Sequence, residues 1–235
     1  KLARRKGVRV LIDDAQYLGT HREDVSTLGA DFVAFSGHKL GGPFGTGVLW
    51  GHETELNRLR HYKLGGGTVK SVTWDGKKGL PEAVYLDAPM RFEAGVQDFG
   101  GALGLHEALK LRESLPAAAL RGHVSSLVTR AAAALAKLSH IRVLGRPEDL
   151  AKGSLVTFVA AHPDFSPVDF NLFLNHELPG RFVAVRVGEH CAHLQHRRLG
   201  VDATVRASFG PYNTTAEADV FVDAVTSYAK EACGG

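Results

Sequence analysis

Two short β-rich runs, each followed at once by polar side chains, constrain the fold of this chain more than any other feature. The first run, residues 8–12 (VRVLI), leads directly to Asp13, and the second, residues 31–35 (DFVAF), leads to Ser36. Both runs are apolar on both faces, and helical or loop sequence separates them, which is typical of strands buried in an α/β sheet. Open α/β sheets bind ligands just beyond the carboxyl ends of their strands, so the residues after both runs are candidate site residues.

The remaining sequence alternates helical and strand patterns, and its composition changes at about residue 115. We expect a glycine-rich loop over 41–47, a strand over 48–50, and an extended surface excursion over 63–90, where no period is sustained. Residues 1–115 are predicted to be the carboxyl-terminal part of a large domain, and residues 116–235 a small α/β domain. Helices are expected over 24–28, 100–114, 120–138, 169–176 and 215–232, the last capped by Thr214 or Thr215, and later strands over 141–144, 154–160, 181–187 and 205–209.

The first seven residues bear on whether the chain is a fragment. The residues KLARRK, followed by Gly7, have the pattern of a basic last helical turn and its glycine stop. The only methionine is Met90. We therefore expect a fragment, or one product of a cleaved or split polypeptide, whose missing amino-terminal portion holds part of any active site.

Composition excludes several classes of protein. With 44% hydrophobic and 23% charged residues, the chain has enough apolar side chain for a sizeable core. Its net charge of +3 is small and dispersed, so neither nucleic acid nor an anionic membrane is expected as a partner. Cys191 and Cys233 lie too far apart to suggest a disulfide framework, which favours a reducing compartment. No apolar run reaches membrane-spanning length and no signal peptide is visible, so a soluble cytoplasmic protein is predicted.

The residues after the two runs offer a specific set of chemical groups. Asp13 ends the first run, whereas Ser36, His38 and Lys39 follow the second. An amine for a Schiff base and a carboxylate for a ring nitrogen suit pyridoxal phosphate, while hydroxyl and imidazole donors could hold its phosphate or phenolate oxygen. Taken one at a time, Asp13 could simply cap a loop and Lys39 could be a solvated surface lysine.

The exact sequences of these segments, and of several later ones, point to a protein family. The chain resembles the fold-type I pyridoxal phosphate enzymes of the class V aminotransferase and cysteine desulfurase family, in particular the group II, SufS-like desulfurases. The segments that carry the resemblance occur in the family's order over nearly the whole chain: DDAQ (13–16), SGHK (36–39) with GGPFGTGVLW, GGG (65–67), RFEAG (91–95), RVGEHCA (186–192) and VRASFGPYNT (205–214).

This resemblance implies the roles of the cofactor residues. Lys39 is the lysine that forms the Schiff base and moves the Cα proton, and Asp13 pairs with the pyridinium nitrogen. Gln16 faces the phenolate oxygen, and Ser36 and His38 bind the phosphate. Pyridoxal 5'-phosphate is the implied cofactor, and a homodimer is the implied assembly.

The resemblance also implies the reaction. Arg206 binds the α-carboxylate of a small amino acid substrate, and Cys191 takes its sulfur as a persulfide, so L-cysteine becomes L-alanine. A sulfur-acceptor protein and a place in iron–sulfur cluster assembly follow as expectations. Another class V activity (aminotransferase, selenocysteine lyase or epimerase) and a catalytically incomplete subunit of the same fold remain as alternatives. An arginine in a strand is also suited to a surface ion pair.

Cys191 lies in a predicted polar loop, with residues 188–190 before it and 192–195 after it, at the end of a strand, where a thiol is accessible. A protonated His190 or His193 could lower the pKa of this thiol. The alternative is a small structural residue whose thiol does not react. His190, Cys191, His193 and His196 are also a dense set of metal-ligand types, but their spacing matches no common zinc signature, so no metal is predicted.

Three positions depart from the family's usual pattern. Val96 stands where a threonine commonly reaches the phosphate of the neighbouring subunit's cofactor. Asp14 replaces a glycine or another small residue, and Asp98 stands where asparagine is frequent. The family's phosphate-cradling loop and the ring that stacks on the cofactor are expected upstream of Lys1.

Overall fold

The structure is a computed structural model that describes residues 1–176, 178 and 182–234. The chain forms two compact units, Lys1–Leu115 and Pro116–Gly235. We call them the amino-terminal and carboxyl-terminal units and describe each by itself. No helix among the described residues is long and apolar enough to cross a membrane.

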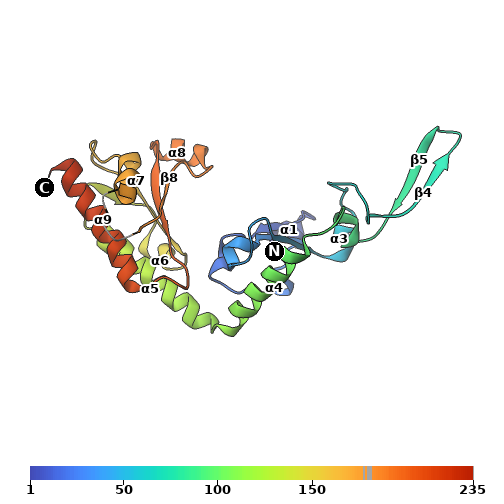
Figure 1. The fold of residues 1–235 in the computed structure, drawn as a ribbon, viewed down its shortest axis with the longest axis horizontal. Coiled ribbons are helices and arrows are strands. Elements are labelled where there is room, and N and C mark those ends of the chain that lie inside the picture. Colours follow the sequence, from blue (N-terminus) through green and yellow to red (C-terminus); the bar gives the residue numbers. More distant parts are fainter. Residues whose placement is uncertain (177, 179–181, 235) are drawn as a thin grey trace. The chain divides into compact units, whose positions relative to one another are not determined.

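A three-stranded sheet in the order β1-β2-β3 organises the amino-terminal unit (Figure 1). Strand β1 (Leu11–Asp13) runs parallel to β2 (Phe32–Ser36), and β3 (Gly47–Gly51) runs antiparallel to β2. The expected strand over 8–12 begins only at Leu11, because the Asp31 carboxylate accepts the Val10 N–H at 2.7 Å before the parallel register begins. Since β1 and β2 are parallel, their carboxyl ends lie at one edge of the sheet.

Short helices connect these strands, and one long helix ends the unit. Helix α4 (Phe99–Ser114) begins at Asp98, whose carboxylate accepts the Gly101 N–H at 2.8 Å. At its other end, Arg22 donates to the carbonyl oxygens of Arg112, Glu113 and Leu115 at 2.5–2.8 Å and so satisfies groups that a helix end leaves unpaired. The shorter elements are α1 (Leu2–Arg5), η1 (Tyr17–Gly19), α2 (Val25–Leu28), η2 (Gly37–Leu40), α3 (Glu53–Leu56) and η3 (Met90–Phe92).

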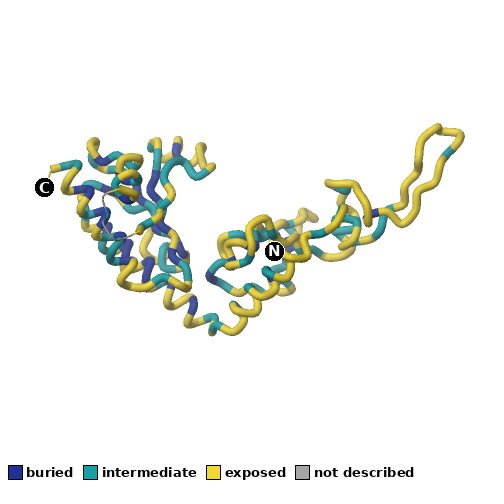
Figure 2. The backbone as a smooth tube through the Cα atoms, viewed as in Figure 1, coloured by how far each residue is buried: buried dark blue, intermediate teal, exposed yellow. Residues whose placement is uncertain are grey.

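The surface excursion expected over 63–90 contains a regular hairpin. Strands β4 (Val69–Asp75) and β5 (Leu80–Tyr85) pair antiparallel, and nearly all of their residues are exposed (Figure 2). Because neither face of the hairpin is buried in this chain, its sequence carries no sustained alternation of apolar and polar residues. The exposure agrees with the expectation of a surface excursion, and the two paired strands are a feature that the sequence did not predict.

The carboxyl-terminal unit is built on a second sheet, in the order β6-β7-β9-β8, with all neighbours antiparallel. Helices α5 and α9 pack on each other and supply much of the core, which includes Val128, Phe158 and Val225. A capping box of Thr214 and Glu217 begins α9. The elements are α5 (Ala117–Leu135), β6 (Ile141–Val143), α6 (Pro147–Leu150), β7 (Leu155–Ala160), α7 (Pro167–His176), β8 (Arg186–Gly188), α8 (His193–Leu199), β9 (Thr204–Ser208) and α9 (Thr215–Cys233).

The expected strand over 181–187 and the expected loop around Cys191 both differ in their bounds from the structure. The strand expected over 181–187 is limited to β8, and residue 181 lies outside the described residues. Residues 182–185 belong to no strand, and together with Ala207–Phe209 they line a cavity of about 340 Å³. Residues 193–195, expected in a loop, belong to the first turn of α8.

Candidate active site

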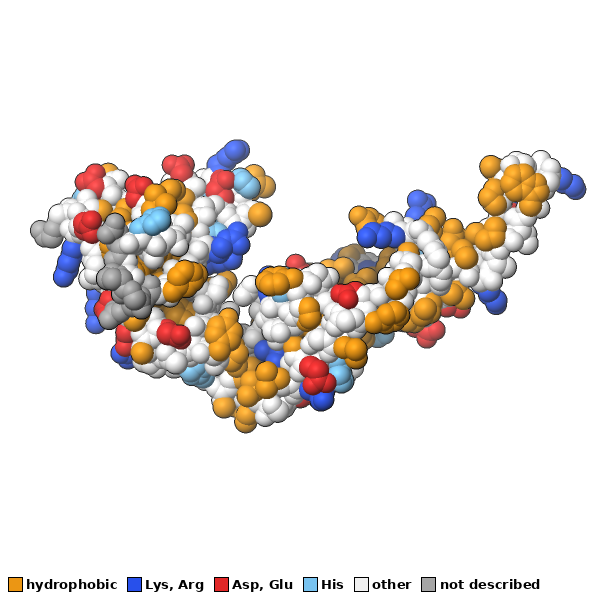
Figure 3. Space-filling view, viewed as in Figure 1, with side chains coloured by type: hydrophobic (Ala, Val, Ile, Leu, Met, Phe, Trp, Pro, Cys, Tyr) orange, Lys and Arg blue, Asp and Glu red, His pale blue; other side chains and the backbone are white. Residues whose placement is uncertain are grey.

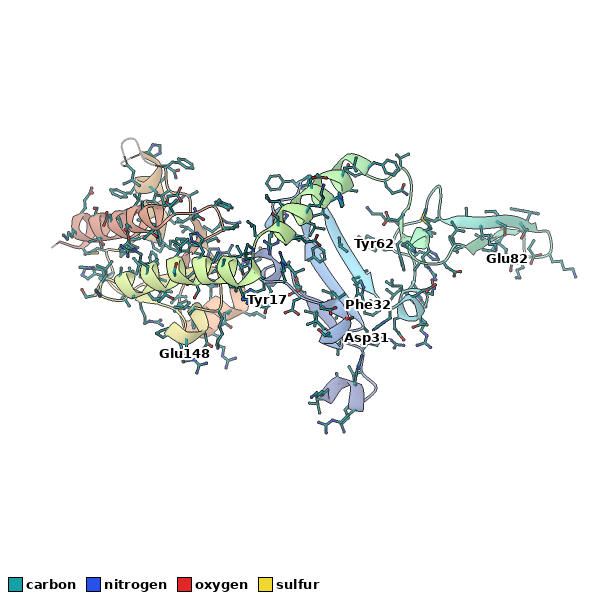
Figure 4. The ribbon with its side chains drawn as sticks, turned by 90° about the horizontal axis from the view of Figure 1, so that it is seen from below. Tyr17, Asp31, Phe32, Tyr62, Glu82 and Glu148 are labelled. Carbon is teal, nitrogen blue, oxygen red and sulfur yellow. The ribbon has the colours of Figure 1, made fainter. Side chains whose placement is uncertain are left out.

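The carboxyl edge of β1 and β2 brings together one group of sequence-predicted residues. Asp13 is the last residue of β1 and pairs in register with Ala34 of β2. Ser36 ends β2, and η2 follows it with His38 and Lys39. Figure 4 labels Tyr17, which follows β1 in η1, and Asp31 and Phe32, where β2 begins. Gln16 directly precedes η1 at the same edge.

Close backbone packing fixes the turn that carries Lys39. The Gly37 N–H donates to the Thr46 carbonyl at 2.8 Å, and a Cβ atom at Gly37 would lie 2.1 Å from Thr46 Oγ1. From α4, the side chain of Leu105 lies 3.2 Å from that same position. Only a glycine fits here without displacing the turn, so the packing between strand and helix places Lys39.

The polar groups at this edge are available for a ligand. Asp13 accepts the Ala15 N–H through Oδ1 at 3.1 Å, and its side chain is exposed. Lys39 is also exposed, and its ammonium makes no ion pair with any described residue. The Ser36 hydroxyl does not cap η2, and the His38 ring stacks on Phe44 with 5.6 Å between ring centroids. A carboxylate, a hydroxyl, an imidazole and an amine at one sheet edge fit the ring nitrogen, phosphate and aldehyde of pyridoxal phosphate.

Asp14 is a further feature of this edge, which the sequence showed only as a departure from the family's pattern. Asp14, the first residue after β1, is buried (5% exposed), whereas Asp13 is exposed. Its Oδ2 atom has no hydrogen-bond partner among the described residues. Burial first, and then the carboxylates of Glu23 and Asp13, raise the pKa of Asp14.

The carboxyl-terminal unit holds the second group, centred on the turn between β8 and α8. Cys191 is exposed at this turn. His190 and Cys191 have φ values of +51° and +61°, a conformation that costs a non-glycine residue about 1–3 kcal/mol. The turn is closed by the Ala192 N–H, which donates to the Glu189 carbonyl at 2.7 Å, and Glu189 pairs with His193 at 2.9 Å. The structure therefore maintains a strained turn at the residue that the sequence singled out.

A cavity of about 720 Å³ lies beside this turn and is lined by both His190 and Arg206. Neither ring nitrogen of His190 has a hydrogen-bond partner among the described residues, nor has Nε of Arg206. Burial, followed by the charge of Arg206, lowers the pKa of His190, which disfavours the protonated imidazole that the sequence suggested beside the thiol. The cavity offers a guanidinium for an anion and an imidazole next to it.

Two buried residues of this unit form a pair that the sequence did not predict. The sequence indicated His196 only as one of several metal-ligand residue types, and it gave no signal for Thr204. The structure buries both and links them by a hydrogen bond of 3.2 Å between His196 Nε2 and Thr204 Oγ1. No signal in the sequence joins a helix residue to a strand residue in this way. Over the described ranges, no group of three or more His, Cys, Asp or Glu residues is arranged to hold a metal ion.

Comparison with known proteins places the chain in a family. The sequence profile of the Aminotransferase class-V family matches residues 1–221, and the chain belongs to this family. It is 40% identical over 230 residues to the probable cysteine desulfurase 1 of Mycobacterium leprae, covering 98% of this chain and 35% of that protein. It is 36% identical to a probable cysteine desulfurase of Vibrio cholerae, covering 95% of this chain and 52% of that protein.

Solved structures give the same result for the fold. The crystal structure of the cysteine desulfurase CsdA from Escherichia coli, in an S-sulfonic acid form, matches with a TM-score of 0.86 and 33% identity. The match covers 98% of this chain and 54% of that one, so the chain spans about half the length of this relative. The fold is that of fold-type I enzymes, whose cofactor is pyridoxal phosphate, as the sequence predicted.

We predict that Arg206→Gln raises the pKa of His190 towards, but not up to, its ordinary value of about 6.5, because burial is the larger cause of the shift. Histidine-selective NMR titration measures this pKa directly. The folded state binds fewer protons here than the unfolded chain, so this imidazole reduces stability as the pH falls through 6.5. Arg142→Gln, at the same cavity, serves as the control. An unchanged His190 pKa in Arg206→Gln contradicts the assignment.

Proposed function

We propose that this chain belongs to a pyridoxal phosphate-dependent cysteine desulfurase, which converts L-cysteine to L-alanine and holds the sulfur as a persulfide on Cys191. The observation that carries the proposal is the exposed Cys191 on a strained turn beside a cavity lined by Arg206. The desulfurase names of relatives at 35–40% identity support it. Residues 1–115 would then complete the cofactor-binding domain, and residues 116–235 would form the small domain.

The groups at the sheet edge have distinct tasks in this proposal. When bound, pyridoxal phosphate supplies an electron sink next to the substrate's Cα. Lys39 holds the cofactor covalently and then moves the Cα proton. The Asp13 carboxylate accepts a hydrogen bond from the protonated ring nitrogen. Gln16 faces the phenolate oxygen, and Ser36 and His38 donate to the phosphate.

The carboxyl-terminal unit supplies the remaining groups. Arg206 holds the substrate's α-carboxylate, for which a planar guanidinium can donate two parallel hydrogen bonds. The Cys191 thiolate forms a bond to the substrate's sulfur as the bond between that sulfur and Cβ breaks. The electron pair of the broken bond stays with Cβ, which takes up a proton and becomes the methyl group of alanine. Because Cys191 is exposed, a sulfur-acceptor protein can reach its persulfide.

We further propose that the enzyme is a cytoplasmic homodimer and supplies sulfur for iron–sulfur cluster assembly. The β4–β5 hairpin supports the dimer, because an isolated two-stranded hairpin is at best marginally stable. Its register puts Val72 opposite Ala83 and Trp74 opposite Pro81, so these four apolar side chains share one face. Figure 3 shows hydrophobic side chains gathered over this hairpin. A second copy of the chain would cover this face.

Lys39→Ala is expected to abolish covalent attachment of pyridoxal phosphate, because no other described lysine directly follows a buried strand of this sheet. The complete gene product is loaded with cofactor, treated with borohydride and digested, and mass spectrometry then locates the pyridoxyl group. Lys77→Ala, in the exposed hairpin turn, is the matched control and should retain the label at Lys39. A label on another lysine in the Lys39→Ala protein would show that the assignment is wrong.

Cys191→Ser should leave the cofactor's visible absorption and amino acid binding nearly unchanged while it eliminates the persulfide. Alanine formation from cysteine is expected to fall at least 100-fold with little change in KM, since the thiolate acts only in the chemical step. Cys233→Ser is the control, because that thiol lies on α9 and burial raises its pKa. If Cys191→Ser desulfurates normally, or the unaltered enzyme transaminates and releases no sulfur, another class V activity replaces the proposal.

Trp74→Lys should weaken the homodimer at least tenfold, because it places a charge at the centre of the apolar hairpin face. Thr73→Lys adds the same charge to the opposite face, across from Glu82, and should leave the dimer intact. Sedimentation velocity over a range of protein concentrations measures both. An unaltered protein that sediments as a monomer and still turns over would exclude the dimer.

A further inference from the structure

The turn that carries Cys191 is held at both ends by one buried pair of side chains. Nδ1 of His196, on α8, lies 3.0 Å from the carbonyl oxygen of Ala192, at the end of the turn. The hydroxyl of Thr204, on β9, lies 3.3 Å from the carbonyl oxygen of Gly188, at its start, and 3.2 Å from Nε2 of His196. A carbonyl oxygen only accepts, so the ring proton lies on Nδ1 and is donated to Ala192, and the single hydroxyl proton of Thr204 is shared between the Gly188 carbonyl and Nε2. The two anchors therefore form one connected brace.

Burial distinguishes this brace from the other contacts of the turn. His196 is 5% exposed and Thr204 is 2% exposed. The pair formed by Glu189 and His193 lies on the outer side of the turn, where water competes for it. Buried hydrogen bonds are costly to leave unmade, so the brace restrains the turn in addition to the backbone N–H groups of Gln195 and His196, which also donate to the Ala192 carbonyl.

The brace also spans the strained residues. Between the anchored carbonyls of Gly188 and Ala192, the chain has positive φ values at His190 and Cys191. A non-glycine residue persists in this conformation only where its surroundings enforce it. Both ring nitrogens of His196 are engaged within the protein, which accounts for a histidine at this position without a metal ion.

We propose that His196 and Thr204 are positioning residues: they hold Gly188–Ala192 in the strained turn that presents the Cys191 thiol for sulfur transfer. The link to sulfur transfer rests on the proposed desulfurase function, whereas the link to the turn's conformation does not. Neither residue takes part in bond making. They act through the two carbonyl groups that they bind.

Hydrogen exchange tests the conformational part on the complete, cofactor-loaded protein. Thr204→Val removes the hydroxyl at nearly constant volume, and Thr204→Ser retains it. We expect amide exchange in the peptide containing the Cys191 turn to rise at least fivefold in Thr204→Val and to stay within twofold in Thr204→Ser. Peptides from α9 should be unchanged in both and serve as the control for global folding. Equal exchange of the turn in the two variants overturns the proposal.

A second pair of variants keeps the test decisive if Thr204→Val does not fold. His196→Asn places an amide N–H near the position of Nδ1 and can keep the bond to Ala192, whereas His196→Leu removes both bonds. The same fivefold contrast in exchange is expected. If His196→Leu and His196→Asn exchange alike at the turn, the brace does not control its conformation.

Kinetics test the catalytic part. Thr204→Val and His196→Leu should lower kcat for alanine formation about tenfold with KM within twofold, and Thr204→Ser and His196→Asn should recover most of the loss. Unchanged kcat in variants with a loosened turn would overturn the positioning role. If the unaltered enzyme forms no persulfide on Cys191, the proposed function fails, and the exchange rates still decide whether the brace controls the turn.

Discussion

The parallel pairing of β1 with β2 is the constraint on which the candidate cofactor site depends. Parallel strands end at the same edge, so pairing Asp13 with Ala34 places a carboxylate beside the turn that carries Lys39. Antiparallel pairing would send these groups to opposite ends of the sheet. The rest of the amino-terminal unit reinforces this arrangement: Leu105 of α4 packs on the turn at Gly37, where a side chain would collide with Thr46.

Much of this could be predicted from the sequence because the signals are local. Asp13 follows one apolar run directly and Lys39 lies four residues beyond the end of the other, at Phe35, and the Thr214 cap of α9 has its glutamate three residues on, as a capping box requires. Residues 182–185 show why local signals fail elsewhere. Their run of apolar residues suits a strand, yet a strand also needs a partner, and β9 pairs only with Arg186–Gly188 on this side. No short window of the sequence encodes where that pairing ends.

The site residues that the sequence missed depend on contacts between elements. His196 and Thr204 meet only because α8 folds back on the sheet that contains β9, and their partners are backbone carbonyls, which have no sequence signature. The positive φ values of His190 and Cys191 are equally hidden, because both residue types usually adopt other conformations. Strain of this kind is informative for the same reason: local preference opposes it, so the surrounding structure must enforce it.

Asp14 shows how burial can separate the properties of two adjacent acids. A site that keeps a ring nitrogen protonated needs an ionised carboxylate, and a second negative charge next to it would be repelled. Asp13 is exposed and Asp14, directly after β1, is buried, and burial together with the charges of Glu23 and Asp13 raises the pKa of Asp14. A raised pKa reduces the tendency of Asp14 to carry a second negative charge beside Asp13. The acid at a position where the family usually has a small residue is in this way compatible with the task proposed for Asp13.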